Sequence, residues 1–244
     1  IGEVVGDVSN LRLIDAHYRI DGNPEAAAAF EAALAETEVA EESAVAAFAG
    51  NAEATATLEG LKADTQAFAT AFRRSVELQD ARTALLATML GHANAARSAA
   101  EEVLVSSSTA GHTASVVQAG AASEAILQML LHAEKYLASG EEADFSEIAV
   151  QGKKATDALN GLIAVLNMFR PELAATADEA VAGIGPYLAS SDQLKALTVE
   201  RNDLWTGTLD VAGEAIEQAL TGLQAQVVEK QASVGGASAA QAQG

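Results

Sequence analysis

The chain contains no cysteine, and its 244 residues include only three prolines and few aromatic side chains. Without cysteine, the protein has no disulfide, no thiolate zinc site, no iron–sulfur cluster and no c-type haem attachment. Scarce proline leaves long helices uninterrupted. The residues that remain are dominated by alanine, leucine, glutamate and glutamine, which favour helix. The composition therefore predicts an all-α protein.

Basic residues are also scarce, because fourteen Lys and Arg stand against thirty-four Asp and Glu, for a formal charge of −20. Nucleic-acid binding needs Lys and Arg to neutralise phosphates, so we expect no nucleic-acid partner. An anionic lipid surface is disfavoured for the same reason.

The sequence motifs of several enzyme classes are missing. The sequence has no Glu-x-x-His pair, no His-Glu-x-x-His motif, no Gly-rich phosphate loop and no Gly-x-Ser-x-Gly elbow. The four histidines are scattered without ligand spacing. We therefore predict a protein that is not an enzyme, with no catalytic residue, no metal site and no cofactor.

No apolar run approaches the roughly 20 residues needed to cross a bilayer. The chain begins with Ile and has no signal peptide, so we expect an excised soluble region of a longer protein. Residues 233–244 lose large apolar side chains and gain Gly, Ser and Gln, which predicts a frayed tail or linker.

Turn signals divide the chain into six predicted helices, four short and two about twice as long. The predicted helices are the start to about Ile20, Pro24–Ala49, Glu53–Val105, Thr113–Ala138, a helix ending at Phe169, and Pro171–Gln231. The fifth has an apolar seam with steps of three and four: Phe145, Ile148, Gly152, Ala155, Leu159, Leu162, Leu166 and Phe169. The stretch GIGPYLASSD at 183–192 predicts a kink or interruption in the sixth, which would make the count seven.

The six predicted helices follow one another as two short helices and a long one, and then again as two short helices and a long one. This order has a simple geometric explanation. At about 1.5 Å per residue, a double-length helix serves two bundles placed end to end. We therefore predict two stacked four-helix bundles, built from six helices, that share the two long ones within a single domain. The lower module comprises about residues 1–79 and 200–232, and the upper module about residues 80–199.

Two segments with the same order of helix, aromatic residue, small-residue turn and next helix carry a family resemblance. They read RLIDAHYRIDGNPEAAAAFEAAL and LLHAEKYLASGEEADFSEI. With these segments, its length and its helix order, the chain resembles the helical bimodular (HBM) sensor domains found in the periplasmic part of bacterial chemoreceptors and some sensor histidine kinases.

The resemblance implies a periplasmic domain of an inner-membrane protein, flanked by two transmembrane helices, with the lower module proximal to the membrane. It also implies a methyl-accepting chemotaxis receptor that binds a small organic anion, such as a carboxylate, through arginines between helices and signals across the membrane. Isolated from its membrane helices, such a domain is expected to form at most a weak or ligand-dependent homodimer.

Two alternatives stay open. One is the sensor domain of a histidine kinase that acts with a periplasmic binding protein. The other is a structural helical-bundle interaction protein without a small ligand, against which charged residues on helix seams argue weakly.

Arginines gather near the expected junction of the two modules. Six of the eight lie within about ten residues of it, roughly 15 Å: Arg12, Arg19, Arg73, Arg74, Arg82 and Arg201. Arginine suits a carboxylate because it donates two parallel hydrogen bonds. The candidate ligand-binding residues are Arg12, Tyr18, Arg73, Arg201 and Trp205.

Arg201 is the leading candidate, because it lies on a predicted seam and its guanidinium is expected in the interior. The other seam residues are Leu194, Leu197, Leu204, Thr208 and Val211. Trp205, one turn on, is expected to anchor the helix or to cover that guanidinium. Tyr18 lies on the apolar seam of the first helix and Arg12 flanks that seam, within reach of the same interior. We predict one carboxylate held jointly by Arg12 and Arg201.

For Arg73, Arg74 and Arg19 we favour ordinary solvated ion pairs over ligand contacts. Arg73 with Glu77, and Asp15 with Arg19, have the four-residue spacing of solvated surface pairs on a helix. A possible second site lies in the upper module, where the seam position of Arg97 predicts another interior cation, and His132 and Tyr136 share a helix face.

Overall fold

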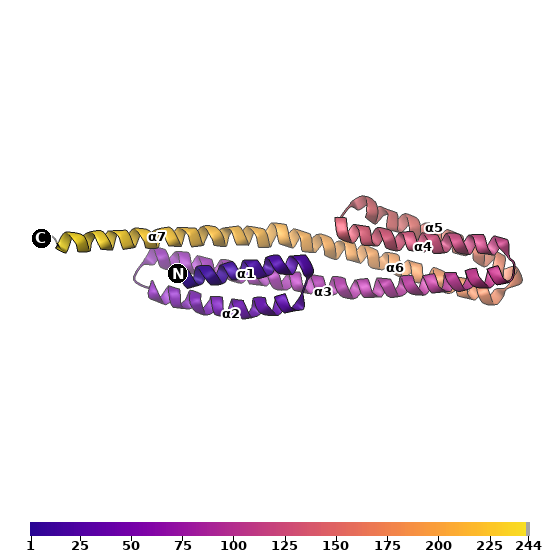
Figure 1. Cartoon of the computed structure of the whole chain (residues 1–244), viewed down its shortest axis with the longest axis horizontal. Coiled ribbons are helices and arrows are strands. Elements are labelled where there is room, and N and C mark those ends of the chain that lie inside the picture. Colours follow the sequence, from indigo (N-terminus) through magenta and orange to yellow (C-terminus); the bar gives the residue numbers. More distant parts are fainter. Residues whose placement is uncertain (243–244) are drawn as a thin grey trace. The chain divides into compact units, whose positions relative to one another are not determined.

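The structure is a computed structural model that describes residues 1–242, and every regular element within them is helical (Figure 1). The all-α prediction is confirmed. The helices are α1 Gly2–Asp21, α2 Pro24–Ala47, α3 Ala52–Thr109, α4 Thr113–Ser139, α5 Glu142–Phe169, α6 Pro171–Leu204 and α7 Asp210–Ala242, with a π turn, Trp205–Leu209, between α6 and α7.

Glycine ends two of the short helices in the same way. Gly22 adopts a left-handed φ of 64°, and its N–H donates to the carbonyl oxygen of Tyr18. Gly140 has a φ of 72°, and its N–H donates to the carbonyl oxygen of Tyr136. Glycine reaches this conformation without a steric penalty, so both Tyr-x-x-x-Gly motifs form the same helix cap.

The interruption predicted at 183–192 is wrong, because α6 is continuous through Pro186. One of the glycines that suggested a break instead serves packing. A Cβ on Gly183 would lie 3.0 Å from the backbone oxygen of His92 in α3, so the two helices approach closely there. The irregularity occurs later, at the π turn.

α7 continues to Ala242, through most of the stretch for which a frayed tail or linker is expected. Its alanine and glutamine residues are good helix formers, which offset the glycines among them. Residues 243–244 lie outside the described residues.

Contacts divide the chain into two compact units. We call residues 1–80 with the chain from 199 onward the terminal unit, and residues 81–198 the central unit.

The core of the terminal unit is built by α1, α2, the first part of α3, the π turn and α7. Phe30 stacks on Phe72 with ring centroids 3.8 Å apart, and Tyr18 meets Phe72 edge-on at 5.2 Å. The π turn and α7 contribute the buried side chains of Leu209, Ile216, Leu220 and Leu223.

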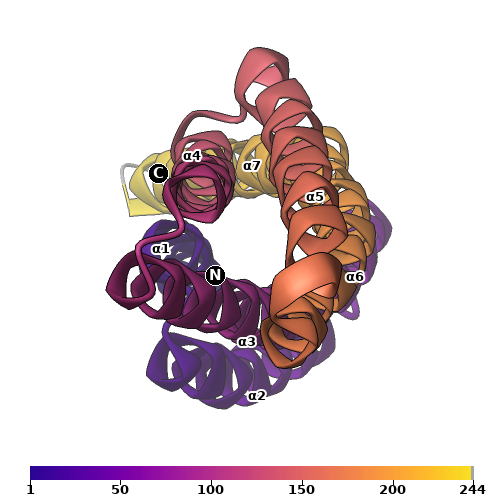
Figure 2. The same cartoon turned by 90° about the vertical axis from the view of Figure 1, so that its right-hand side faces the viewer.

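In the central unit, α3, α4, α5 and α6 surround one core (Figure 2). The predicted seam of α5 is confirmed from Ile148 to Leu166, where all six positions are buried. Its last position is not, since Phe169 is 60% exposed at the end of the helix. Tyr187 of α6 is buried in this core, and burial raises its pKa to about 12.

By length and composition, one helix among the described residues is apolar enough to cross a membrane, namely α4. The expectation that no run is long and apolar enough is therefore wrong for α4, whose many alanines contribute to its apolar character. Ala119, Ile126 and Met129 of α4 are fully buried in the central core. The core helices of soluble proteins in general meet the same criterion, so α4 is weak evidence for a membrane span.

A carboxyl group is buried in the terminal unit. Glu41 of α2 is 0% exposed, and its Oε1 accepts a hydrogen bond from Thr65 Oγ1 at 2.7 Å, while its Oε2 has no partner in the described part of the chain. Burial raises the pKa of Glu41, and the hydrogen bond from Thr65 and the charge of Lys62 offset only part of that effect. The fold therefore carries a group that is costly to ionise.

Candidate functional site

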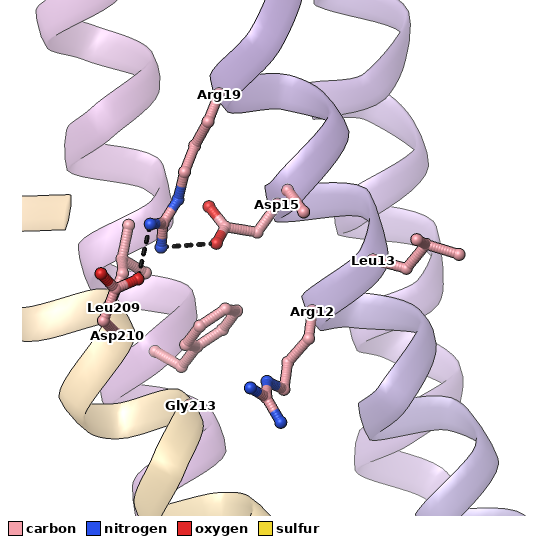
Figure 3. A pocket seen from close by; sticks show the side chains of 9 residues that line it. Arg12, Leu13, Asp15, Arg19, Leu209, Asp210 and Gly213 are labelled. Carbon is pink, nitrogen blue, oxygen red and sulfur yellow. Dashed lines mark hydrogen bonds and ion pairs between the residues drawn. The ribbon is translucent and has the colours of Figure 1, made fainter. Parts of the chain in front are cut away.

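A groove of about 470 Å³ lies on the terminal unit between α1 and the start of α7 (Figure 3). Its lining residues are Arg12, Leu13, Asp15, Ala16, Arg19, Phe68, Leu209, Asp210 and Gly213. Helical spacing explains one wall, because Arg12, Asp15 and Arg19 recur at steps of three and four and so share one face of α1.

The π turn sets the other wall. A π turn contains one residue more than an α turn, so it advances the buried seam of the helix by one position. Leu209 is buried, whereas Thr208 and Val211, which were predicted to lie on the seam, are exposed. The same shift brings Asp210 and Gly213 to the groove.

Arg19 joins the two walls. Its guanidinium lies 2.7 Å from Asp15 Oδ2 on α1 and 2.6 Å from Asp210 Oδ1 on α7 (Figure 3). The predicted ion pair between Asp15 and Arg19 is confirmed, but it is not solvated, because only 6% of the Asp15 side chain and 20% of the Arg19 side chain are exposed.

Burial raises the pKa of Asp15, and the hydrogen bond and charge of Arg19 offset this only in part. Burial by itself would lower the pKa of Arg19, but the two carboxylates outweigh it and raise that pKa. Arg19 is therefore a permanent cation held between two acids.

Arg12 is held more weakly. Its Nη1 lies 2.8 Å from Glu217 Oε2, but 66% of the Glu217 side chain is exposed. Ion pairs this open to solvent contribute little. A Cβ on Gly213 would lie 3.2 Å from Arg12 Nε, so the absence of a side chain there lets the guanidinium lie close against α7.

Arg201 and Trp205 are outside the residues that line this groove. Arg201 donates to Gln79 Oε1 and to Asn202 Oδ1, each at 3.1 Å, and its guanidinium lies 4.3 Å from the centre of the Trp205 ring. Trp205 Nε1 donates to Ser75 Oγ at 2.7 Å, which anchors the ring to α3. Trp205 thus both anchors the helix and covers the guanidinium.

The structure does not bring Arg12 and Arg201 together. Arg12 meets α7 at Gly213 and Glu217, and Gly213 follows Arg201 by twelve positions (213 − 201 = 12), about 18 Å of helix at 1.5 Å per residue. Tyr18 packs into the core with 2% exposure, and burial, with Asp80 adding, raises its pKa to about 12. It does not line the groove.

Arg73 forms a surface pair, although with a different partner from the predicted one. Its Nε and Nη2 donate to the two oxygens of Glu31 on α2, at 2.8 and 2.7 Å. Glu77, the partner suggested by spacing, pairs instead with Arg74 at 2.9 Å. Spacing along one helix does not reveal partners on a neighbouring helix.

The prediction of an interior Arg97 is wrong. Its side chain is 38% exposed and pairs with Glu101 at 2.9 Å, because the small side chains of Ala93, Ala96 and Ala100 take the buried face of α3.

His132 and Tyr136 lie elsewhere in the central unit. His132 Nδ1 lies 2.9 Å from Asp144 Oδ1, and Tyr136 packs on Phe145 with ring centroids 5.1 Å apart. Burial raises the pKa of Tyr136, whose charged neighbours are Lys195, Glu142 and Arg82. The predicted second site is thus not assembled around Arg97.

Within residues 1–242, no three His, Asp or Glu side chains are grouped so as to hold a metal ion. Comparison with models of known protein families gives no match, and comparison with curated proteins gives none either. The chemistry of the groove is therefore the basis for the function proposed below.

Proposed function

We propose that this protein is a ligand-sensing domain that binds a small organic anion, such as a carboxylate, in the groove between α1 and α7. The supporting observation is that two arginines, Arg12 and Arg19, line one groove in a chain with a formal charge of −20. Arginine in such a place is suited to two parallel hydrogen bonds with a carboxylate.

Arg12 is the residue that a ligand can engage. Its present partner, Glu217, is exposed, so a ligand carboxylate can replace that pair with little loss. Arg19 holds Asp15 and Asp210 and fixes the distance between the groove walls. Phe68 and Leu209, which are almost fully buried, form an apolar part of the lining, and a volume of about 470 Å³ suits a small molecule.

The proposed setting is the extracytoplasmic part of a transmembrane chemoreceptor, in the periplasm, with membrane helices outside this sequence. In it, two four-helix bundles are stacked and share α3 and the α6–α7 helix. Helix lengths support this arrangement, since α3 has 58 residues and α1 and α2 have 20 and 24.

The stacking is tested by spin labels at Asp21 and Ser139, the last residues of α1 and α4. If both turns lie at one level of a stacked pair, the label distance is on the order of two or three helix diameters, about 20–35 Å. Labels at Asp21 and Thr109, the last residue of α3, form the control pair and are expected to be farther apart. A longer distance for Asp21 and Ser139 than for the control pair contradicts the stacked arrangement.

Carboxylate binding is tested by thermal unfolding of the chain with acetate, succinate, malate and citrate. A ligand at a hundred times its dissociation constant stabilises the fold by about 2.7 kcal/mol, which raises the melting temperature. Arg12→Gln is expected to weaken that ligand at least tenfold, a loss of about 1.4 kcal/mol. Arg170→Gln, which removes an arginine of the central unit paired with Glu172, is the matched control and should bind like the parent.

The variant Arg201→Gln tests whether the ligand binds in the groove or instead beside Arg201 and Trp205. We expect it to retain binding. If it abolishes the shift while Arg12→Gln does not, the site lies at Arg201 and Trp205. If no carboxylate raises the melting temperature of the parent, the proposed function is wrong.

A further inference from the structure

Among the residues that the structure describes, two buried polar atoms of the groove have no hydrogen-bond partner. They are Asp15 Oδ1, an acceptor, and Arg19 Nε, a donor. Asp15 is 4% exposed, and only its other oxygen reaches Arg19. A buried polar atom without a partner is costly, and carboxylate oxygens accept several hydrogen bonds, so Asp15 is suited to a donor from a bound molecule.

The groove thus offers a carboxylate, Asp15, that can accept a hydrogen bond and a cation, Arg12, that can donate one. We infer that the ligand is a zwitterion, an α-amino acid, whose ammonium group faces Asp15 and whose carboxylate faces Arg12. The inference rests on the proposed function, because it keeps Arg12 as the partner of the carboxylate. Arg12 and Asp15 are three residues apart on one helix face, a spacing of about 5–6 Å between Cβ atoms. An α-amino acid carries its two charges on adjacent groups, with one carbon between them, so it can contact two neighbouring side chains at once.

Ligands with a single kind of charge fit less well. A dicarboxylate would place a second negative charge beside the buried carboxylate of Asp15, and a simple amine would face Arg12 and Arg19. A zwitterion places a positive group at Asp15 and a negative group at Arg12.

Long-range electrostatics favour the same class of ligand. The formal charge of −20 repels an approaching anion, whereas an amino acid with a neutral side chain carries no net charge and is not repelled.

The experiment is calorimetric titration of the chain with the twenty L-amino acids. The affinity for each amino acid is compared with the affinities for its analogue without the amino group and its analogue without the carboxylate. For alanine these are propionate and ethylamine, and for glutamate one is glutarate. We expect at least one amino acid to bind ten or more times tighter than both of its analogues.

Asp15→Asn is expected to abolish the difference in affinity between the amino acid and its analogues. It should leave the affinity for the deamino carboxylate unchanged or higher. Asp203→Asn, which alters an exposed acid of the same unit, should bind the amino acid and its analogues with the same difference in affinity as the parent. If Asp15→Asn does not fold, the comparison of analogues on the parent decides by itself. A deamino carboxylate that binds as tightly as its amino acid, with Arg12 required, overturns the zwitterion and leaves the proposed function standing. Binding of amines alone, or of no compound, overturns both.

Discussion

Deletion of Gln218 from α7 is expected to lower the free energy of unfolding of the terminal unit by about 3–6 kcal/mol. Deletion of Gly207 from the π turn is expected to change it by no more than about 1 kcal/mol. Both variants lose one residue from the same continuous helical segment, so the contrast isolates the role of helix register.

The cost of the first deletion follows from the core. Leu220 and Leu223 are 7% and 0% exposed, and removing Gln218 moves Thr221 and Gln224 into their positions. Burial of each leucine is worth about 1.5–3 kcal/mol, and both are lost. The π turn can absorb the deletion only by shifting Leu209, Gly213 and Ile216 instead, which is equally unfavourable.

The second deletion is tolerated because the π turn contains one extra residue. Its hydrogen bonds run from residue i to i+5, so removing one residue converts it to an α turn and leaves the register of α7 unchanged. Thr206, Gly207 and Thr208 are all exposed, so no core contact is lost.

Urea unfolding followed by circular dichroism measures both deletions. Equal losses of stability would mean that the π turn does more than add one residue between α6 and α7.

Glu41→Met is expected to stabilise the terminal unit by about 1–3 kcal/mol at neutral pH, since it removes a buried carboxylate, one oxygen of which has no partner among the described residues. Methionine has a similar length and fills irregular spaces well. Thr65 keeps a partner in this variant, because its single hydroxyl proton can be donated instead to the backbone oxygen of Leu61, 3.0 Å away.

The gain depends on pH in a direction set by the raised pKa of Glu41. The folded protein holds this proton more tightly than the unfolded chain does, so the protonated carboxyl costs little below the unfolded pKa, 4.5. As pH rises through the folded pKa, the stability linked to that proton is lost. Glu41→Met therefore gains most near pH 7 and least near about pH 4.

Glu42→Met is the matched control. Glu42 is the next residue, its side chain is 69% exposed, and it pairs with Lys62 at 3.1 Å. Its replacement should change stability by no more than about 0.5 kcal/mol at either pH. Urea unfolding of the three proteins at both pH values provides the measurement. A loss of stability in Glu41→Met at neutral pH, or a gain that does not depend on pH, would contradict the account of a strained buried carboxyl.

Most helix ends were predictable from the sequence because they have local causes. Gly22 and Gly140 adopt a left-handed conformation that suits glycine, and Asn23 caps α2 by accepting from the N–H of Glu25. The seam of α5 was predictable for a related reason, since its apolar residues keep one period over the whole helix.

Local signals were less reliable for α6 and α7. Pro186 and Gly183 suggest a break, but packing against α3 keeps α6 continuous. The π turn occurs in a segment, WTGTL, without proline, and its effect is seen only when the buried positions on both sides are compared.

The sequence by itself determined the helical class, the cysteine-free chemistry, the caps at Gly22 and Gly140, and the pairing of Asp15 with Arg19. Each depends on composition or on residues within four positions of one another. The tertiary structure alone decided that Arg73 pairs with Glu31, that Arg12 and Arg201 lie apart, and that Arg19 meets Asp210. These contacts join different helices, so they depend on how far each helix is rotated. One added residue in the π turn is enough to change which side chains face the groove.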